Sequence, residues 1–170
     1  MIAPSYVRTM AAYNSEMNRR LYGAAARIPD AARRADRGAF WGSLHRTLAH
    51  LLWGDTMWMS RFDGWERPAM ALSASGDMFA DFAAMAAARS AADARIETWA
   101  GRVTPAWLEQ DLVWFSGAAR QERRAGRGFL VTHFFNHQTH HRGQAHSILC
   151  GFGRRDLVLD LLAYQRETAR

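Results

Sequence analysis

The sequence predicts an all-α fold: a four-helix bundle with a small β-hairpin between helices three and four and a short C-terminal helix. Four long stretches place apolar residues at the spacing of amphipathic helices, and four such helices form a bundle. A short β-prone run separates the third stretch from the fourth, and an apolar segment follows near the C-terminus. With 49% hydrophobic and 12% aromatic residues, the chain has a globular rather than a disordered composition.

Turn-forming residues set the expected ends of the helices. Proline and glycine turns end the first, second and fourth helices, and Ser73 and Ser75 are candidate N-caps for the third. Alanine dominates the third helix, so its neighbours can approach it closely. The expected helices run over about residues 6–26, 38–62, 76–101 and 129–150, followed by a terminal helix over about 157–167.

The segment between residues 103 and 128 has the pattern of a hairpin. The β-forming run Leu-Val-Trp-Phe at 112–115 is followed by Gly117, which favours a turn, and by a polar stretch at 121–124. We therefore expect two short strands at this point in the chain.

Basic residues are spread along the whole chain. The formal net charge is +6, and all 22 basic residues are arginine. Glu122 interrupts their one dense group, which has the pattern of an exposed turn. The arginines of this group are Arg120, Arg123, Arg124 and Arg127. No expected helix carries a one-sided arginine stripe, so we predict no nucleic-acid partner.

Length and cysteine content indicate one domain in a reducing compartment. Residues 1–170 fit a single domain with a substantial core, and Cys150, the only cysteine, excludes an intramolecular disulfide. The N-terminus lacks the pattern of a signal peptide, and no run approaches about twenty apolar residues. We therefore expect a cytoplasmic protein with no membrane partner. Seven tryptophans and nine phenylalanines exceed what a small bundle uses internally, which favours a homodimer.

The fourth expected helix contains a concentration of histidine. His137 and His141 are four residues apart, so their side chains differ by roughly 40° around the axis and lie one turn apart on the apolar face. A lone histidine on such a face is usually a hydrogen-bonded core residue, but two in register indicate a metal site. His133 and His140 lie at the edge of this face, and His146 points away from it.

A third ligand must come from another helix. His133 lies about 12 Å along the axis from His141, too far for one ion to bind both at metal–nitrogen distances of about 2 Å. His45 and His50 on the second helix are the candidates, and they are separated by roughly 140° on the wheel, so one pocket is not expected to hold both. Periodicity does not choose between them.

Two further polar residues are candidates for supporting roles. Asp55 lies near the centre of the apolar face of the second helix, where an unpaired carboxylate would be costly. It serves either as a metal ligand or outer hydrogen-bond acceptor, or as the partner of an arginine or a helix N-terminus. Gln144 lies one turn beyond His141 on the same stripe and is placed to hydrogen-bond a ligand.

Two segments resemble the DinB-like family of four-helix metalloenzymes, which belongs to the DinB and thiol-dependent transferase superfamily. They are residues 44–58 (LHRTLAHLLWGDTMW) and 136–144 (NHQTHHRGQ), and the total length also fits, so the resemblance covers nearly the whole chain. The metal triad of that family combines one histidine of helix two with the His-x-x-x-His pair of helix four. The resemblance therefore implies His50, His137 and His141 as ligands.

Three imidazoles leave a position open for an exogenous ligand, as in catalytic rather than structural sites. Nitrogen donors suit zinc or nickel. The resemblance implies a metal-dependent enzyme of thiol-dependent S-transferase type that uses a low-molecular-weight thiol and a small-molecule substrate, and the same site could activate water for hydrolysis. The alternative is a non-catalytic, stress-related protein that binds a small ligand and carries a structural metal. The sequence identifies no catalytic residue beyond the ligands.

Overall fold

The computed structural model describes residues 1–117 and 119–168 and is mostly helical, with one antiparallel hairpin and a C-terminal helix, as the sequence predicts. The long helices are α1 (Pro4–Ala26), α3 (Leu44–Phe62), α4 (Phe82–Arg102) and α6 (Arg127–Gly151). The shorter elements are α2 (Asp30–Arg34), the 3-10 helix η1 (Leu72–Asp77), α5 (Pro105–Glu109), β1 (Asp111–Ser116), β2 (Gln121–Gly126) and α7 (Leu161–Thr168).

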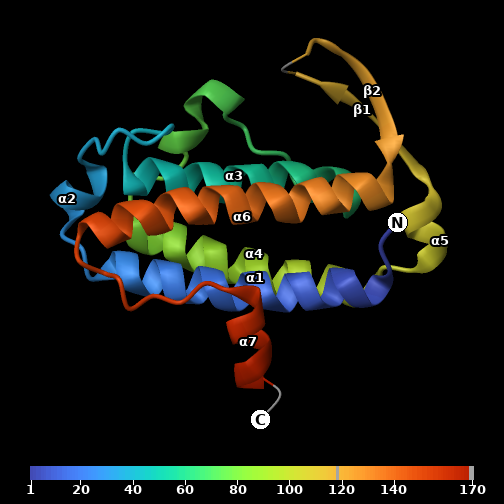
Figure 1. Cartoon of the computed structure of the whole chain (residues 1–170). Coiled ribbons are helices and arrows are strands. Elements are labelled where there is room, and N and C mark those ends of the chain that lie inside the picture. The colour runs from blue at the N-terminus through green and yellow to red at the C-terminus, as the bar shows by residue number, and fades with distance from the viewer. Residues whose placement is uncertain (118, 169–170) are drawn as a thin grey trace.

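The four long helices pack in two layers (Figure 1). α3 and α6 lie side by side in one layer, and α1 and α4 lie side by side in the other. The layers meet through contacts of α1 with α6 and of α3 with α4. The apolar faces of all four helices are buried between the layers, where water is excluded. Large, fully buried side chains of this core include Met17, Leu21, Leu48, Met59, Met85, Ile96, Phe134 and Phe135.

Helix α3 begins later than the apolar periodicity indicates, at Leu44 rather than near residue 38. Gly38 and Gly42 adopt positive φ angles of 69° and 76°, which a helix does not contain, so the chain turns here. The Ser43 side chain then accepts a hydrogen bond from the Arg46 amide and caps the helix. The expected helical start at 38 is therefore wrong, because apolar spacing does not report the glycine turns.

Helix α4 also begins later than expected. The Asp81 carboxylate accepts a hydrogen bond from the Ala84 amide, at 2.7 Å, and caps α4. The expected caps Ser73 and Ser75 lie instead in η1, which packs on α3. Ser75 is buried there and does not cap α4.

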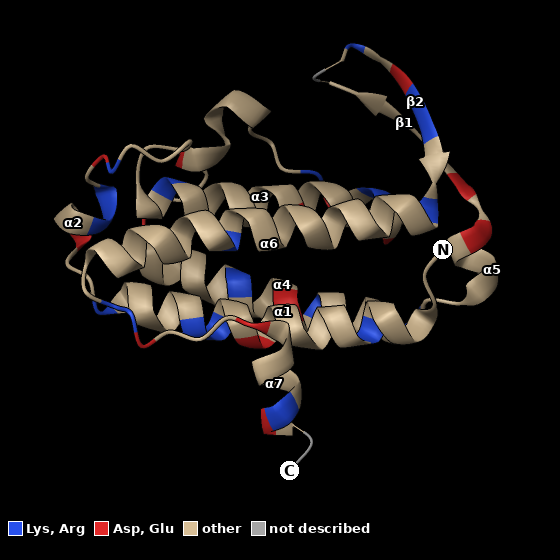
Figure 2. Ribbon diagram, in the orientation of Figure 1, with Lys and Arg blue, Asp and Glu red and all other residues tan. Residues whose placement is uncertain are grey.

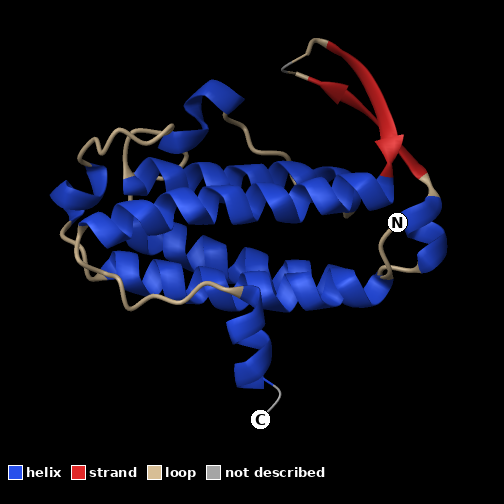
Figure 3. Cartoon of the chain, viewed as in Figure 1, coloured by secondary structure: helices blue, strands red, loops and turns tan. Residues whose placement is uncertain are grey.

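The hairpin stands out from the helical body (Figure 3), and the short helix α5, which the periodicity does not reveal, leads into it. In the antiparallel register Trp114 lies opposite Arg123 and Val113 opposite Arg124. The charged residues of the chain are spread over helices and hairpin (Figure 2), in agreement with the scattered arginines of the sequence. Every described helix is either too short or too polar to span a lipid bilayer.

A buried ion network joins the two layers. Arg89 of α4 donates to Asp55 of α3 at 2.6 Å and to Asp93 at 2.7 Å, and Asn18 of α1 donates to Asp93 at 2.9 Å. Burial raises the pKa of both carboxyl groups, that of Asp93 to about 6, and the Arg89 guanidinium opposes this rise. Because water is excluded, each charge depends on its partners within the protein.

We expect Asp55→Ala to lower the free energy of unfolding by about 3 kcal/mol, because it leaves the buried Arg89 with one carboxylate instead of two. Chemical denaturation would measure the change. The control is Asp111→Ala, which removes an exposed carboxylate 3.4 Å from Arg124 and should cost less than about 1 kcal/mol. Equal losses in both variants would show that the network does not stabilise the fold.

Candidate metal centre

Three imidazole rings from two helices meet between α3 and α6. His50 comes from α3, and His137 and His141 come from α6. The ring centroids are 5.4 Å apart for His50 and His137, 4.6 Å for His50 and His141, and 4.4 Å for the α6 pair. Each ring offers one nitrogen, and these nitrogens all lie within 4.8 Å of one another, so the group could hold a metal ion.

The close approach of the two helices depends on Gly54 of α3. A Cβ atom at this position would lie 2.7 Å from Cε1 of His137 and 3.3 Å from its Nδ1. Both distances are shorter than ordinary van der Waals contact, so the ring of His137 occupies space that any other residue at position 54 would fill. Gly54 lies one turn after His50, which brings that histidine to the same place on α3.

Hydrogen bonds fix the orientation of two of the rings. Nδ1 of His141 lies 2.8 Å from Oε1 of Gln144, whose amide nitrogen donates to Nε2 of His140 at 3.1 Å. An amide oxygen only accepts, so Nδ1 of His141 donates and its Nε2 keeps a free lone pair. Nδ1 of His50 lies 2.8 Å from the Ser75 hydroxyl, and this hydrogen bond orients the second ring.

The facing nitrogens fit a cation. Nε2 of His141 lies 3.1 Å from Nε2 of His137, and two lone pairs at this distance repel unless a proton or a metal ion lies between them. Burial lowers the pKa of His50 and of His137 to about 3 and also lowers that of His141, with neighbouring histidines contributing. All three rings are therefore neutral near pH 7, which is the form that binds metals.

Aromatic side chains enclose His50. The Trp41 ring stacks on it with centroids 4.0 Å apart, and Trp53 lies at 6.0 Å on a nearly parallel plane. Trp41 comes from the turn that precedes α3, the same turn that displaces the start of the helix. An apolar enclosure of this kind limits the access of water to the ring and strengthens electrostatic interactions at its nitrogen.

The chain matches the DinB family model over residues 1–170. It belongs to the DinB family. The resemblance of the two histidine-containing segments is thereby confirmed, and the family together with the three-histidine group fits a metal-binding DinB protein. A search of the curated proteins gives no match to the chain.

Other candidate residues of this DinB-family protein lie outside the group. His45 is buried, but its Nε2 hydrogen-bonds the Phe79 carbonyl at 2.7 Å, on the side of the loop before α4. Asp55 accepts from Arg89, and no hydrogen bond joins it to a histidine within the described part of the chain. Of the alternatives that the sequence leaves open for Asp55, the structure therefore shows the pairing with an arginine. Gln144 does contact a member of the triad.

Three residues of the site were missed by sequence reasoning. The sequence pattern predicts Ser75 as a helix cap, and it distinguishes neither Gly54 nor Trp41. Only Gly54 carried a usable signal, because a glycine inside an apolar helix one turn from a histidine indicates close packing. Arg142 of α6 is also buried, and its guanidinium donates to the Asn14 amide oxygen of α1.

We expect Gly54→Ala to weaken metal binding at least about tenfold, because the added methyl displaces the ring of His137. Metal affinity would be measured by competition with a chromophoric chelator. Gly143→Ala is the matched control, since it lies on α6 with no atom within 4 Å of the added methyl. Unchanged affinity in Gly54→Ala would mean that the ring does not need its present position.

We expect Gln144→Ala and Ser75→Ala each to weaken metal binding by about 10- to 100-fold while the fold persists, because each removes the partner that orients one ring. The same chelator competition measures affinity, and circular dichroism monitors the fold. Thr98→Ala, on the exposed side of α4, serves as the control. Affinities equal to that of the unmodified protein would contradict an orienting role.

Proposed function

We propose that this protein is a metal-dependent enzyme in which His50, His137 and His141 hold a divalent ion, zinc or nickel. The reaction is of thiol-dependent S-transferase or hydrolase type, with a small-molecule substrate and, in the first case, a low-molecular-weight thiol. The observation that carries the proposal is the convergence of three neutral imidazole nitrogens within 4.8 Å of one another. Membership of the DinB family supports it.

The composition of the group favours chemistry over a purely structural ion. Structural zinc sites usually have four protein ligands, whereas catalytic sites have three and leave a position for substrate or water. Among the described residues, no cysteine or carboxylate joins the three histidines in a group of this size. Cys150, the only cysteine, lies 3.6 Å from the ring of His146 instead.

A divalent ion held by His50, His137 and His141 would lower the pKa of a thiol or water bound to it and would so allow nucleophilic attack near neutral pH. The protein's own residues prepare this chemistry. Gln144 orients the ring of His141 and Ser75 orients that of His50 through hydrogen bonds to Nδ1. Trp41 stacks on His50 and limits its contact with water. The uncharged state of the rings leaves the net positive charge of a bound ion undiminished.

We expect His141→Ala, His137→Ala and His50→Ala each to lose stoichiometric metal, because two imidazoles bind such ions much more weakly than three. Elemental analysis of the purified proteins would quantify the metal. His45→Ala is the control, since this histidine is buried on the same helix as His50 but faces the Phe79 carbonyl. Full metal content in His141→Ala would discard the proposed triad.

We expect the metal-loaded protein to accelerate the reaction of a small thiol with an electrophile, or the hydrolysis of an activated ester or amide. Screening would follow the consumption of thiol and of substrate separately. Activity should fall at least about 100-fold on chelation and return when zinc or nickel is restored, because the ion would activate the thiol or water as the nucleophile. An acceleration that survives chelation would assign it to another group.

One observation favours a second candidate, a non-catalytic, stress-related protein that binds a small ligand beside a structural metal. A cavity of about 470 Å³ adjoins the site, and this volume is within the range of small-molecule pockets. Gln144, which is hydrogen-bonded to His141, lies in the wall of the cavity. A metal ion without an exchangeable ligand position, seen by spectroscopy of the cobalt-substituted protein, would favour this candidate over the enzyme.

Several finer features belong to the same proposal. We interpret the four packed helices as the four-helix bundle of a single domain that spans residues 1–170. The homodimer and the cytoplasmic location stay predictions. Sedimentation at low concentration tests the first of these, and a single monomeric species would contradict it.

A further inference from the structure

Arg61, near the end of α3, carries a half-buried guanidinium. Burial and, to a lesser degree, Arg67 lower the pKa of its guanidinium. In the part of the chain that the structure describes, no carboxylate oxygen lies within 4.0 Å of a nitrogen of Arg61, Arg67 or Arg123. A partly desolvated charge of this kind is costly unless an anion compensates it.

Two tryptophan rings lie close to this cation. The guanidinium carbon of Arg61 lies 4.6 Å from the ring centroid of Trp58 and 5.8 Å from that of Trp114 on the hairpin. The two tryptophan rings are 5.9 Å apart and inclined at 62°. Arginine against two indoles forms a surface with a charged end and a flat apolar side, and such a surface suits a ligand with the complementary parts.

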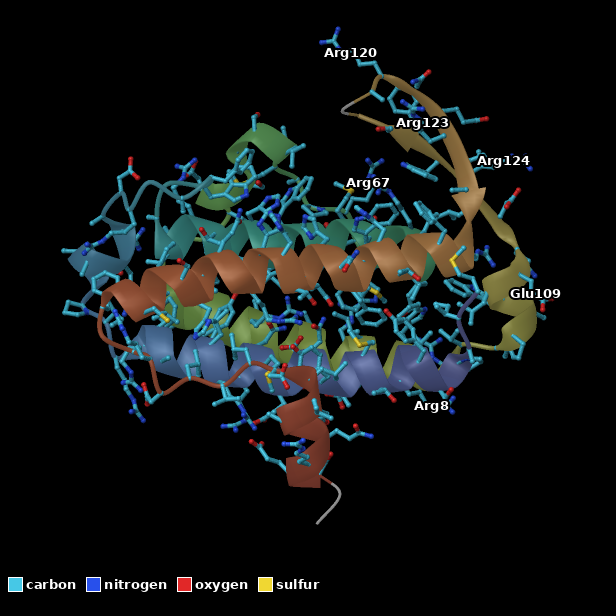
Figure 4. The ribbon with its side chains drawn as sticks, viewed as in Figure 1. Arg8, Arg67, Glu109, Arg120, Arg123 and Arg124 are labelled. Carbon is cyan, nitrogen blue, oxygen red and sulfur yellow. The ribbon has the colours of Figure 1, made fainter. Side chains whose placement is uncertain are left out.

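The hairpin adds a second cation to the same side. Trp114 and Arg123 are directly opposed across the strands, so their side chains share one face of the hairpin. The acidic residues Asp111 and Glu122 occupy alternate positions and belong to the other face. In the view of Figure 4, Arg67 lies beneath the hairpin that carries Arg123.

Arg61, Arg67 and Arg123 form a cationic cluster beside Trp58 and Trp114. A chain of contacts leads from Trp58 to the candidate metal centre. The Trp58 ring lies 5.2 Å from that of His133, which in turn lies 6.1 Å from that of His137. Trp58 follows Gly54 by one turn of α3, and His133 precedes His137 by one turn of α6. The cationic cluster and the three histidines are therefore neighbours along the same pair of helices.

We propose that Arg61, assisted by Arg67 and Arg123, binds the oxyanion group of a small molecule whose planar apolar part lies against Trp58 and Trp114. The ligand class is a small carboxylate or phosphate with a flat apolar portion. Arginine recognises both oxyanions through paired N–H donors. If this molecule is also the substrate, its other end reaches the metal centre. Only this last point rests on the proposed function.

Calorimetric titration of the metal-loaded, full-length protein with benzoate and with phenyl phosphate tests the proposal, and the two arms distinguish carboxylate from phosphate. Benzyl alcohol is the neutral control with the same ring. We expect at least one anion to bind about tenfold more tightly than benzyl alcohol, because a charge-assisted hydrogen bond is lost in the neutral compound. Equal binding of all three, or binding of none, would overturn the proposal.

Variants identify the site. Arg61→Gln should weaken binding of the preferred anion at least about tenfold and Arg123→Gln severalfold, whereas Arg124→Gln, on the opposite face of the hairpin, should leave it unchanged. Circular dichroism checks the fold, and Arg61→Lys, which keeps the charge, should retain part of the affinity. Equal weakening by Arg123→Gln and Arg124→Gln would show that the surface charge, not this face, attracts the anion.

His141→Ala separates this inference from the proposed function. Binding of the anion should persist in that variant within about threefold, because the oxyanion contacts Arg61 rather than the metal. Loss of binding together with loss of metal would assign the carboxylate or phosphate to the ion and overturn the role of Arg61. A short single-stranded oligonucleotide that displaces the anion at lower concentration than phenyl phosphate would overturn the small-molecule class.

Discussion

The site depends on one close contact, the approach of the His137 ring to the backbone of Gly54. The absence of a side chain at position 54 lets α6 bring its imidazole against α3, where His50 lies one turn away. Without that approach the three rings could not share one ion, since metal–nitrogen bonds are about 2 Å long. The glycine weakens the helix slightly, by roughly 1 kcal/mol relative to alanine, and the packing of α3 on α6 offsets this cost.

The segments of α3 and α6 that form the histidine group also contribute buried polar residues to the core. Asp55 follows Gly54 on α3, and Gln138 follows His137 on α6, and both are completely buried. Successive residues of a helix are rotated by about 100° around its axis. Asp55 and Gln138 therefore point away from the histidine group and into the core. Arg89 of the opposite layer compensates the charge of Asp55. The ion network therefore ties α4 to α3 directly behind the candidate metal centre, which holds the ring-bearing segment in place.

The sequence predicts those parts of the site that lie within one helix. The His137 and His141 pair and Gln144 follow from periodicity, because spacing along a helix determines which side chains share a face. The choice of His50 over His45 depends on how α3 is rotated against α6, which is a tertiary property that the family resemblance supplied. Ser75 and Trp41 could not be predicted at all, because they reach the rings from a 3-10 helix and a turn whose positions the chain pattern does not determine.

The fold was predictable for a related reason. The four long helices and the hairpin have strong local patterns, whereas their starting points depend on single residues such as Ser43 and Asp81 that cap through their side chains. The error at the start of α3 is informative about the site. The six residues released from the helix, 38–43, include Trp41, so a longer helix would have left His50 without its stacked ring.

The pair α3 and α6 carries different chemistry along its length. At one end the cavity beside Gln144 is lined by Arg37 and Phe40, in the middle the three rings offer nitrogen donors, and at the other end Arg61 lies among tryptophans. Gln144 and His133 connect each end to the rings through direct contacts. Both ends therefore adjoin the donor group along the same two helices. Recognition can then vary at the ends, through loop and hairpin residues, while the histidines and Gly54 keep one geometry in the middle.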